Sequence, residues 1–138
     1  MKKLGVVASS ATLAVLIGVS ASAHHSGAVY FEGTKVEHKN VTVVSYTLVN
    51  PHGRLVYTFT DDAGTKVEWT AELQSANYSR RMGLDPSSFS PGQTLSFVSG
   101  APSRSGAKFI RLDRVVFENG DIAQLAGPDR GIIRAGVK

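Results

Sequence analysis

Apolar and polar residues alternate along much of the chain, which is the spacing of β-strands rather than helices. Two alternating runs flank a turn-forming segment at residues 61–65, where Gly64 suits the left-handed position of a three-residue hairpin loop. That loop pairs Tyr57 with Trp69, whereas a two-residue loop would set Tyr57 against Glu68. Because a slip of one residue would turn every apolar side chain to the wrong face, the three-residue register is predicted. The same register pairs Phe59 with Val67, Leu55 with Ala71, and Arg54 with Glu72, and it sets His52 beside Gln74.

The pattern predicts one strand before this hairpin, and a helix and two strands after it. The first strand is rich in Val, Thr and Tyr and ends before Pro51, which has no amide donor for a ladder. The helix is framed by Ser75, which can cap its first amides, and by Gly83, which suits the left-handed position after its last turn. These elements are expected at 36–49 for the first strand, 75–82 for the helix, and 93–99 and 108–117 for the last strands.

Alternation also gives specific expectations for side chains in the last two strands. In the fourth strand, Leu95 and Phe97 are expected on one face. In the fifth, Ile110 and Leu112 lie on one face, but the next apolar pair, Val115 and Phe117, begins three residues after Leu112 instead of two. An extra residue near 113–114, a β-bulge, would restore the inward set.

Five strands with one short helix between the third and fourth predict an all-β fold, a five-stranded OB-like Greek-key barrel. A β-sandwich is the competing architecture, but it usually has about seven strands. The barrel domain is expected at residues 24–121. The tail at 122–138 holds apolar residues between glycines and a proline. It could pack on the barrel as an extra segment or extend away from it, and the sequence favours neither.

The first 23 residues predict a cleaved export signal. Lys2 and Lys3 precede an apolar run at 4–19, and residues 21–23 (Ala-Ser-Ala) form a small-x-small cleavage pattern. A membrane anchor is the alternative, but hydroxyl residues interrupt the run and it is shorter than the roughly 20 residues of a spanning helix. We therefore expect a periplasmic or secreted protein that has no membrane span after signal cleavage and begins at His24.

Charge and cysteine content narrow the function classes. The chain has 15 Lys and Arg against 11 Asp and Glu, and loss of Lys2 and Lys3 leaves 13 basic residues and a net charge of +2. A nucleic-acid-binding protein would need a concentrated basic stripe, so no nucleic-acid partner is expected. The chain has no Cys, so the apolar core must hold the exported domain without disulfides.

Histidines carry the strongest candidate chemistry. The α-amine and imidazole of a terminal His24 would both be available near pH 7 and could close a chelate ring on one metal ion. A further imidazole, from His25 or His52, would give the nitrogen-rich set that Cu(II) favours, and Glu72 is a candidate fourth ligand or outer-shell support. The arrangement resembles the histidine brace of copper oxygenases and the N-terminal His of periplasmic copper carriers. The alternative is a terminus that binds no ligand, and the isolated His38 is expected to be a surface or hydrogen-bonded residue.

Polar residues near the open end of the hairpin predict a second kind of site. With His52, residues Asn50, Arg54 and Arg80 are candidates to bind a ligand, because the loop between the first two strands is a customary ligand edge of OB barrels. For Arg54 and Glu72 the alternative is an exposed cross-strand ion pair, worth roughly 0.2–1 kcal/mol. The chain shows no nucleophile with an attendant base, no phosphate-binding loop and no close carboxylate pair, which argues against an enzyme without excluding one.

Several short motifs occur in a characteristic order along the mature chain. They are HHS at 24–26, NPH at 50–52, W-x-x-E at 69–72, R-x-x-G at 80–83 and Pro-Gly before the fourth strand. In these motifs the chain resembles a family of small exported bacterial proteins of unknown function. The resemblance implies a periplasmic β-barrel domain with no established activity, and the tail beyond Asp121 departs from the family pattern.

Three functional hypotheses follow. The first is a periplasmic metal-binding protein, with copper as the expected metal, that uses His24, His25 and His52 with Glu72. The second is a metal-free OB-type module that binds a peptide, a glycan, an envelope protein or another small ligand around residues 50–54. The third is an oxygenase built on the same terminal histidine.

Overall fold

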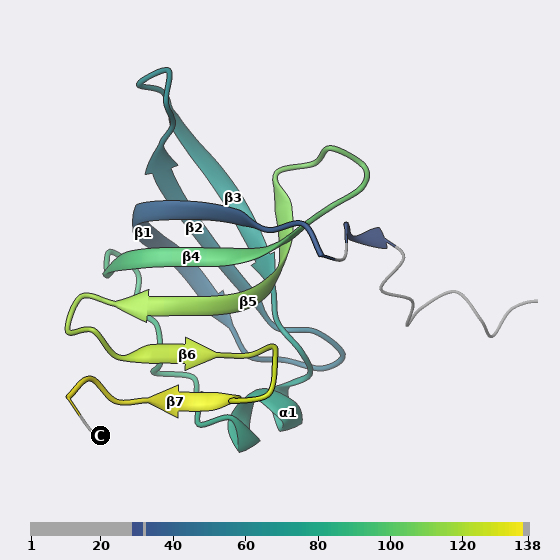
Figure 1. The fold of residues 1–138 in the computed structure, drawn as a ribbon, viewed down its shortest axis with the longest axis vertical. Coiled ribbons are helices and arrows are strands. Elements are labelled where there is room, and N and C mark those ends of the chain that lie inside the picture. Colours follow the sequence, from purple (N-terminus) through teal and green to yellow (C-terminus); the bar gives the residue numbers. More distant parts are fainter. Residues whose placement is uncertain (1–28, 32, 137–138) are drawn as a thin grey trace, which may run out of the picture.

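The structure, a computed structural model, describes residues 29–31 and 33–136. The predicted signal at 1–23 and the candidate ligands His24 and His25 lie outside the described residues. The elements in chain order are β1 (Val36–Thr47), β2 (Arg54–Thr60), β3 (Lys66–Glu72), α1 (Ala76–Arg81), β4 (Thr94–Pro102), β5 (Phe109–Phe117), β6 (Ile122–Gln124) and β7 (Gly131–Ile133) (Figure 1). Within the described ranges, no helix is long and apolar enough to cross a membrane.

The first five strands close into a barrel. Neighbouring strands follow the order β3-β2-β1-β4-β5, and a parallel pairing of β3 with β5 joins the two ends of this series. With α1 between β3 and β4, this is the Greek-key order of an OB-fold. The predicted all-β, five-stranded OB-like barrel with one short helix is therefore confirmed.

The β2–β3 hairpin has the predicted register. Tyr57 pairs with Trp69, and the predicted pairs Phe59–Val67, Leu55–Ala71 and Arg54–Glu72 are present. Asp61 organises the three-residue loop, because its carboxylate accepts hydrogen bonds from two loop amides. Cross-strand packing and turn geometry are both local, which is why the sequence pattern alone predicts this register.

A β-bulge interrupts β5 where alternation predicted it. The β4–β5 register shifts between Ser99 and Gly100, whose partners on β5 lie two residues apart and leave Asp113 as the extra residue. Leu112 and Val115, on either side of the bulge, are both buried in the core. The bulge is thus confirmed, and it keeps both apolar segments of β5 facing inward.

The expectation that Leu95 and Phe97 share a face is wrong. Leu95 and Val98 are fully buried, whereas Phe97 lies outside the core cluster, opposite exposed Lys39. The cause is a backbone irregularity shared by two strands. The β4–β5 register shifts between Leu95 and Phe97, and Asn40 on the adjoining β1 has a left-handed φ of 51°. Both strands therefore change which face is inward at this level of the barrel.

Helix α1 and the tail cover one end of the barrel (Figure 1). Ser75 caps the helix by accepting a hydrogen bond from the Tyr78 amide, and Gly83 follows it with φ +88°, as predicted. An added Cβ at Gly83 would lie 2.9 Å from the Ile132 side chain, so the helix end packs closely on β7. In the tail, β6 pairs with β5 and β7 pairs with β6, so the tail extends the sheet as an antiparallel ribbon.

Candidate functional site

His52 lies in the loop between β1 and β2, at the open end of the hairpin. Its Nδ1 is 3.3 Å from the carbonyl oxygen of Leu73 and 3.8 Å from Oε1 of Glu72, and its side chain is 36% exposed. A carbonyl oxygen can only accept a hydrogen bond, so this contact favours the tautomer with the proton on Nδ1. The lone pair on Nε2 is then available to an external ligand, which is the arrangement of many metal-binding histidines.

Glu72 ends β3 beside this imidazole. Its Oε1 accepts a hydrogen bond of 3.1 Å from the Tyr30 hydroxyl. Burial and the neighbouring Glu72 charge raise the pKa of Tyr30 well above its usual 10, so the hydroxyl keeps its proton and remains a donor. Arg54 on β2 and Arg111 on β5 flank Glu72 in register. Among the described residues, Arg54 and Glu72 form no ion pair, so Glu72 bonds to Tyr30 instead of its predicted cross-strand partner.

The segment that carries Tyr30 is fastened to the barrel by backbone and side-chain contacts. Arg104 donates its amide to the Val29 carbonyl and its Nε to the Tyr30 carbonyl, both at 2.9 Å. Its guanidinium lies 4.9 Å from the ring centroid of Phe31, whose amide bonds to Pro102. The start of the described chain is therefore held beside Glu72.

The other predicted ligand residues do not gather around His52. The side-chain oxygen of Asn50 accepts a hydrogen bond of 3.0 Å from the Ala76 amide, so Asn50 ties its loop to the start of α1. Arg80 lies in the last turn of α1, where its charge acts on Tyr46. Within the described part of the chain, Arg80 makes no hydrogen bond or ion pair with His52 or Glu72, and no three His, Asp or Glu side chains form a potential metal site. A metal site with three such side chains at His52 would need donors from outside the described residues.

Comparison with known proteins gives a family. A family model matches residues 12–110, which is well over half of the chain. The chain belongs to DUF6152, a family of unknown function. The match includes β1 to β4 and the loop of His52, and it ends within β5, so β6 and β7 lie beyond it. Searches of curated proteins and of solved structures returned no significant match.

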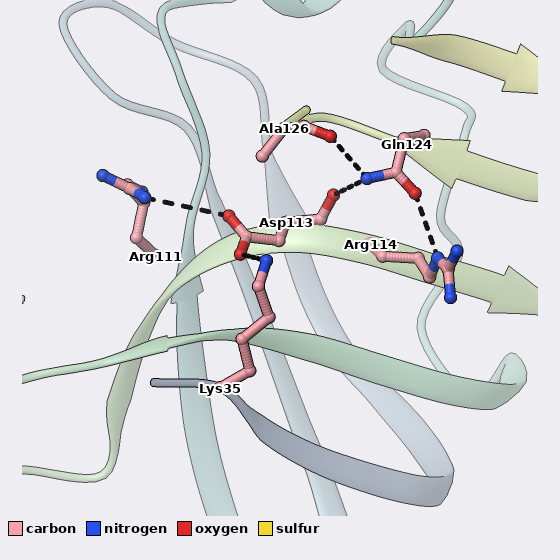
Figure 2. Close-up of polar contacts among 6 residues, drawn as sticks. All are labelled: Lys35, Arg111, Asp113, Arg114, Gln124 and Ala126. Carbon is pink, nitrogen blue, oxygen red and sulfur yellow. Dashed lines mark hydrogen bonds and ion pairs between the residues drawn. The ribbon is translucent and has the colours of Figure 1, made fainter. Parts of the chain in front are cut away.

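In this DUF6152 protein a second polar cluster surrounds the β5 bulge, and sequence reasoning missed it (Figure 2). The Asp113 side chain is only 3% exposed, and its Oδ2 pairs with Lys35. Its Oδ1 lies 3.9 Å from Arg111 and has no hydrogen-bond partner in the described structure. Gln124 of β6 joins the cluster by donating to the Asp113 carbonyl and accepting from Arg114. The cluster therefore connects Lys35, directly before β1, with Gln124 of β6 in the tail.

The bulge pattern located Asp113 in the sequence but could not show its surroundings. A bulged side chain follows neither face of the strand, so alternation does not predict whether it is buried. The one available signal was a carboxylate within an apolar strand. His38, in contrast, is hydrogen-bonded as expected, with Nδ1 2.9 Å from the Tyr57 hydroxyl, but it is buried in the barrel rather than at the surface.

Proposed function

We propose that this DUF6152 protein is a periplasmic metal-binding protein whose metal is copper. In this proposal His24, through its amine and ring, His25 and His52 supply nitrogen ligands. Copper(II) favours such nitrogen-rich sets and stands at the top of the divalent affinity series. Cleavage of the predicted signal after Ala23 would create the free amine on which the chelate depends.

The observation that carries the proposal is that Tyr30 and His52 both meet the same carboxylate. The Tyr30 hydroxyl and His52 Nδ1 lie 3.1 and 3.8 Å from Glu72 Oε1. His24 precedes Tyr30 by six residues, and an extended chain of that length reaches about 20 Å. A terminus leaving Tyr30 therefore has enough chain to return to the imidazole of His52.

The contacts of His52 and Glu72 favour different roles for them. The Leu73 carbonyl holds Nδ1 of His52 and leaves Nε2 for the metal. Glu72 already accepts from Tyr30 and lies between two arginines, so a metal would compete for it with an existing donor. We therefore assign Glu72 to outer-shell support, where it orients Tyr30 and the imidazole.

Copper titration of the exported protein tests the proposal. Mass spectrometry first establishes that the mature chain begins at His24. Electron paramagnetic resonance and competition titration then compare this protein with a His24→Ala, His52→Ala double variant. We expect at least a tenfold loss of Cu(II) affinity and fewer coordinated nitrogens in the double variant. A control with one glycine added before His24 keeps every side chain and displaces only the terminal amine, and it should also lose affinity. Equal affinity in all three proteins would refute the proposal.

The arginines around Glu72 favour one alternative, a metal-free OB-type module that binds a peptide, glycan or envelope protein. Arg54 and Arg111 lie on adjoining strands on either side of Glu72, next to the loop that OB barrels often use for ligands. Such a module would bind its partner equally well with and without a strong chelator. Loss of partner binding after chelation would favour the copper protein instead.

A further inference from the structure

A second part of the barrel, far along the hairpin from His52, has the features of a binding site. A hollow of about 530 Å³ lies beside the closed end of the β2–β3 hairpin, and we call it the His38 hollow. Its lining includes Glu37, His38 and Asn40 of β1, and Phe59, Asp61 and Asp62 at the hairpin end. Its volume is within the range of sites for small molecules, about 300–1,000 Å³.

The imidazole of His38 is fixed in one orientation. The residue is 8% exposed, its ring stacks on Phe59 with centroids 4.1 Å apart, and the Trp69 ring meets it edge-on at 4.5 Å. Nδ1 lies 2.9 Å from the hydroxyl of Tyr57, a residue that is fully buried. Three aromatic side chains therefore prevent the imidazole from turning to satisfy its second nitrogen elsewhere.

The hydrogen bond to Tyr57 determines which nitrogen carries the proton. Burial raises the pKa of Tyr57 far above its usual 10, so the hydroxyl is protonated, and among the described residues its only partner is His38. In the other tautomer the Tyr57 hydroxyl hydrogen would lie in the fully buried core without an acceptor, so the contact favours the tautomer in which the hydroxyl donates to Nδ1. Burial also lowers the pKa of His38, so the neutral ring holds its single proton on Nε2.

The Nε2–H group is a donor without an acceptor in the described structure. His38 lines the hollow, and its Nε2 is not among the fully buried unpaired atoms of the described residues, so this nitrogen is accessible from the hollow. An acceptor on a bound molecule could therefore complete its hydrogen bonding.

The charges around the hollow define the complementary ligand. Three carboxylates, from Glu37, Asp61 and Asp62, face one ammonium, from Lys39. Asp61 Oδ1 already accepts from two loop amides, whereas Glu37 and Asp62 are exposed side chains. The rim therefore attracts a positive charge, while the interior offers a hydrogen-bond donor and the Phe59 ring.

We propose that the His38 hollow is a second binding site, separate from His52, for a small organic cation that also carries a carbonyl oxygen. The carbonyl oxygen accepts from Nε2 of His38, and the cation lies between Glu37 and Asp62. An aliphatic stem between these two groups contacts Phe59. This site goes beyond the proposed copper function, because it shares no residue with it and lies at the opposite end of the hairpin.

The test uses the mature protein and N-acetyl-lysine methylamide as the probe. Trp69 is the one tryptophan of the chain, so its fluorescence reports on the His38 environment directly. We expect saturable quenching or enhancement, together with a change in the ¹⁵N shift of His38 Nε2. The uncharged analogue N-acetyl-norleucine methylamide and the carbonyl-free cation butylamine should each bind at least fivefold more weakly.

Three variants separate the site from general effects on the fold. Glu37→Gln with Asp62→Asn should weaken probe binding at least fivefold, whereas Glu68→Gln, an exposed charge on the same hairpin outside the hollow, should not change it. His52→Ala should bind the probe normally. The rim and control positions are exposed, so these variants are expected to fold. Absence of saturable binding, equal binding of the uncharged analogue, or equal losses in the rim and Glu68 variants would each overturn the proposal.

Discussion

The hydrogen bond between Tyr30 and Glu72 fastens the start of the described chain to β3, and its removal gives a measurable loss of stability. Tyr30→Phe deletes only the hydroxyl and keeps the ring, which is 5% exposed and stacks on Phe109 with centroids 6.2 Å apart. Packing should therefore survive the change. The loss of stability then measures the hydrogen bond itself, including the cost of leaving Glu72 without its donor.

The expected magnitude follows from the exposure of the acceptor. Hydrogen bonds to charged groups contribute about 1.5–3 kcal/mol when buried. The Glu72 side chain is 23% exposed, so water can replace part of the lost donor, and the loss should lie at or just below the lower end of that range. We expect Tyr30→Phe to lower the free energy of unfolding by about 1–1.5 kcal/mol, or roughly 4–8 °C in Tm for a domain of this size.

Urea unfolding followed by Trp69 fluorescence measures this loss. A double-mutant cycle with Glu72→Ala isolates the pair, and we expect a coupling of about 1 kcal/mol. Tyr78→Phe is the matched control, because it removes the same hydroxyl from an exposed contact with Arg130 and should cost less than about 0.5 kcal/mol. A coupling near zero, or equal losses for Tyr30→Phe and Tyr78→Phe, would show that this hydrogen bond does not hold the segment.

Three other changes test the bulge cluster, the buried histidine and the closest backbone approach. Lys35→Ala should destabilise the protein more than Asp113→Asn, by about 1 kcal/mol or more in urea unfolding. It leaves the buried Asp113 carboxylate with only the more distant Arg111, 3.9 Å away, whereas Asp113→Asn leaves a half-exposed ammonium in water. Equal losses would contradict this asymmetry. Since burial lowers the pKa of His38 below 6.5, the unfolded chain takes up that proton first, so stability should fall as the pH drops below about 6.5. His38→Gln should flatten this decline between pH 7 and 5, and an unchanged slope would assign it to other groups. Gly100→Ala would place a Cβ 2.1 Å from the Arg111 carbonyl oxygen, so it should lower the free energy of unfolding by about 3 kcal/mol. Gly106→Ala meets no neighbouring atom, but its φ of +76° is unfavourable for alanine, so it should cost only about 1–2 kcal/mol in the same assay.

Local patterns in the sequence determined much of the barrel and one part of the candidate site. The register of the β2–β3 hairpin, the caps of α1 and the bulge at Asp113 were all predictable, because each depends on residues close together in the chain or directly across a ladder. The nearness of His52 to Glu72 followed from the same register. Strand order was predictable for a related reason, since few topologies accommodate five strands with one helix after the third.

Tertiary structure decided what depends on contacts between distant segments. Phe97 faces outward because the register of β4 shifts between Leu95 and Phe97, next to the left-handed Asn40 on β1. This irregularity changes which residues of both strands face the core. Asn50 bonds to the first turn of α1 rather than to a ligand, because the loop and the helix meet only after the barrel closes. The burial of His38 and Asp113 likewise depends on side chains from other strands, and no period along the chain encodes these contacts.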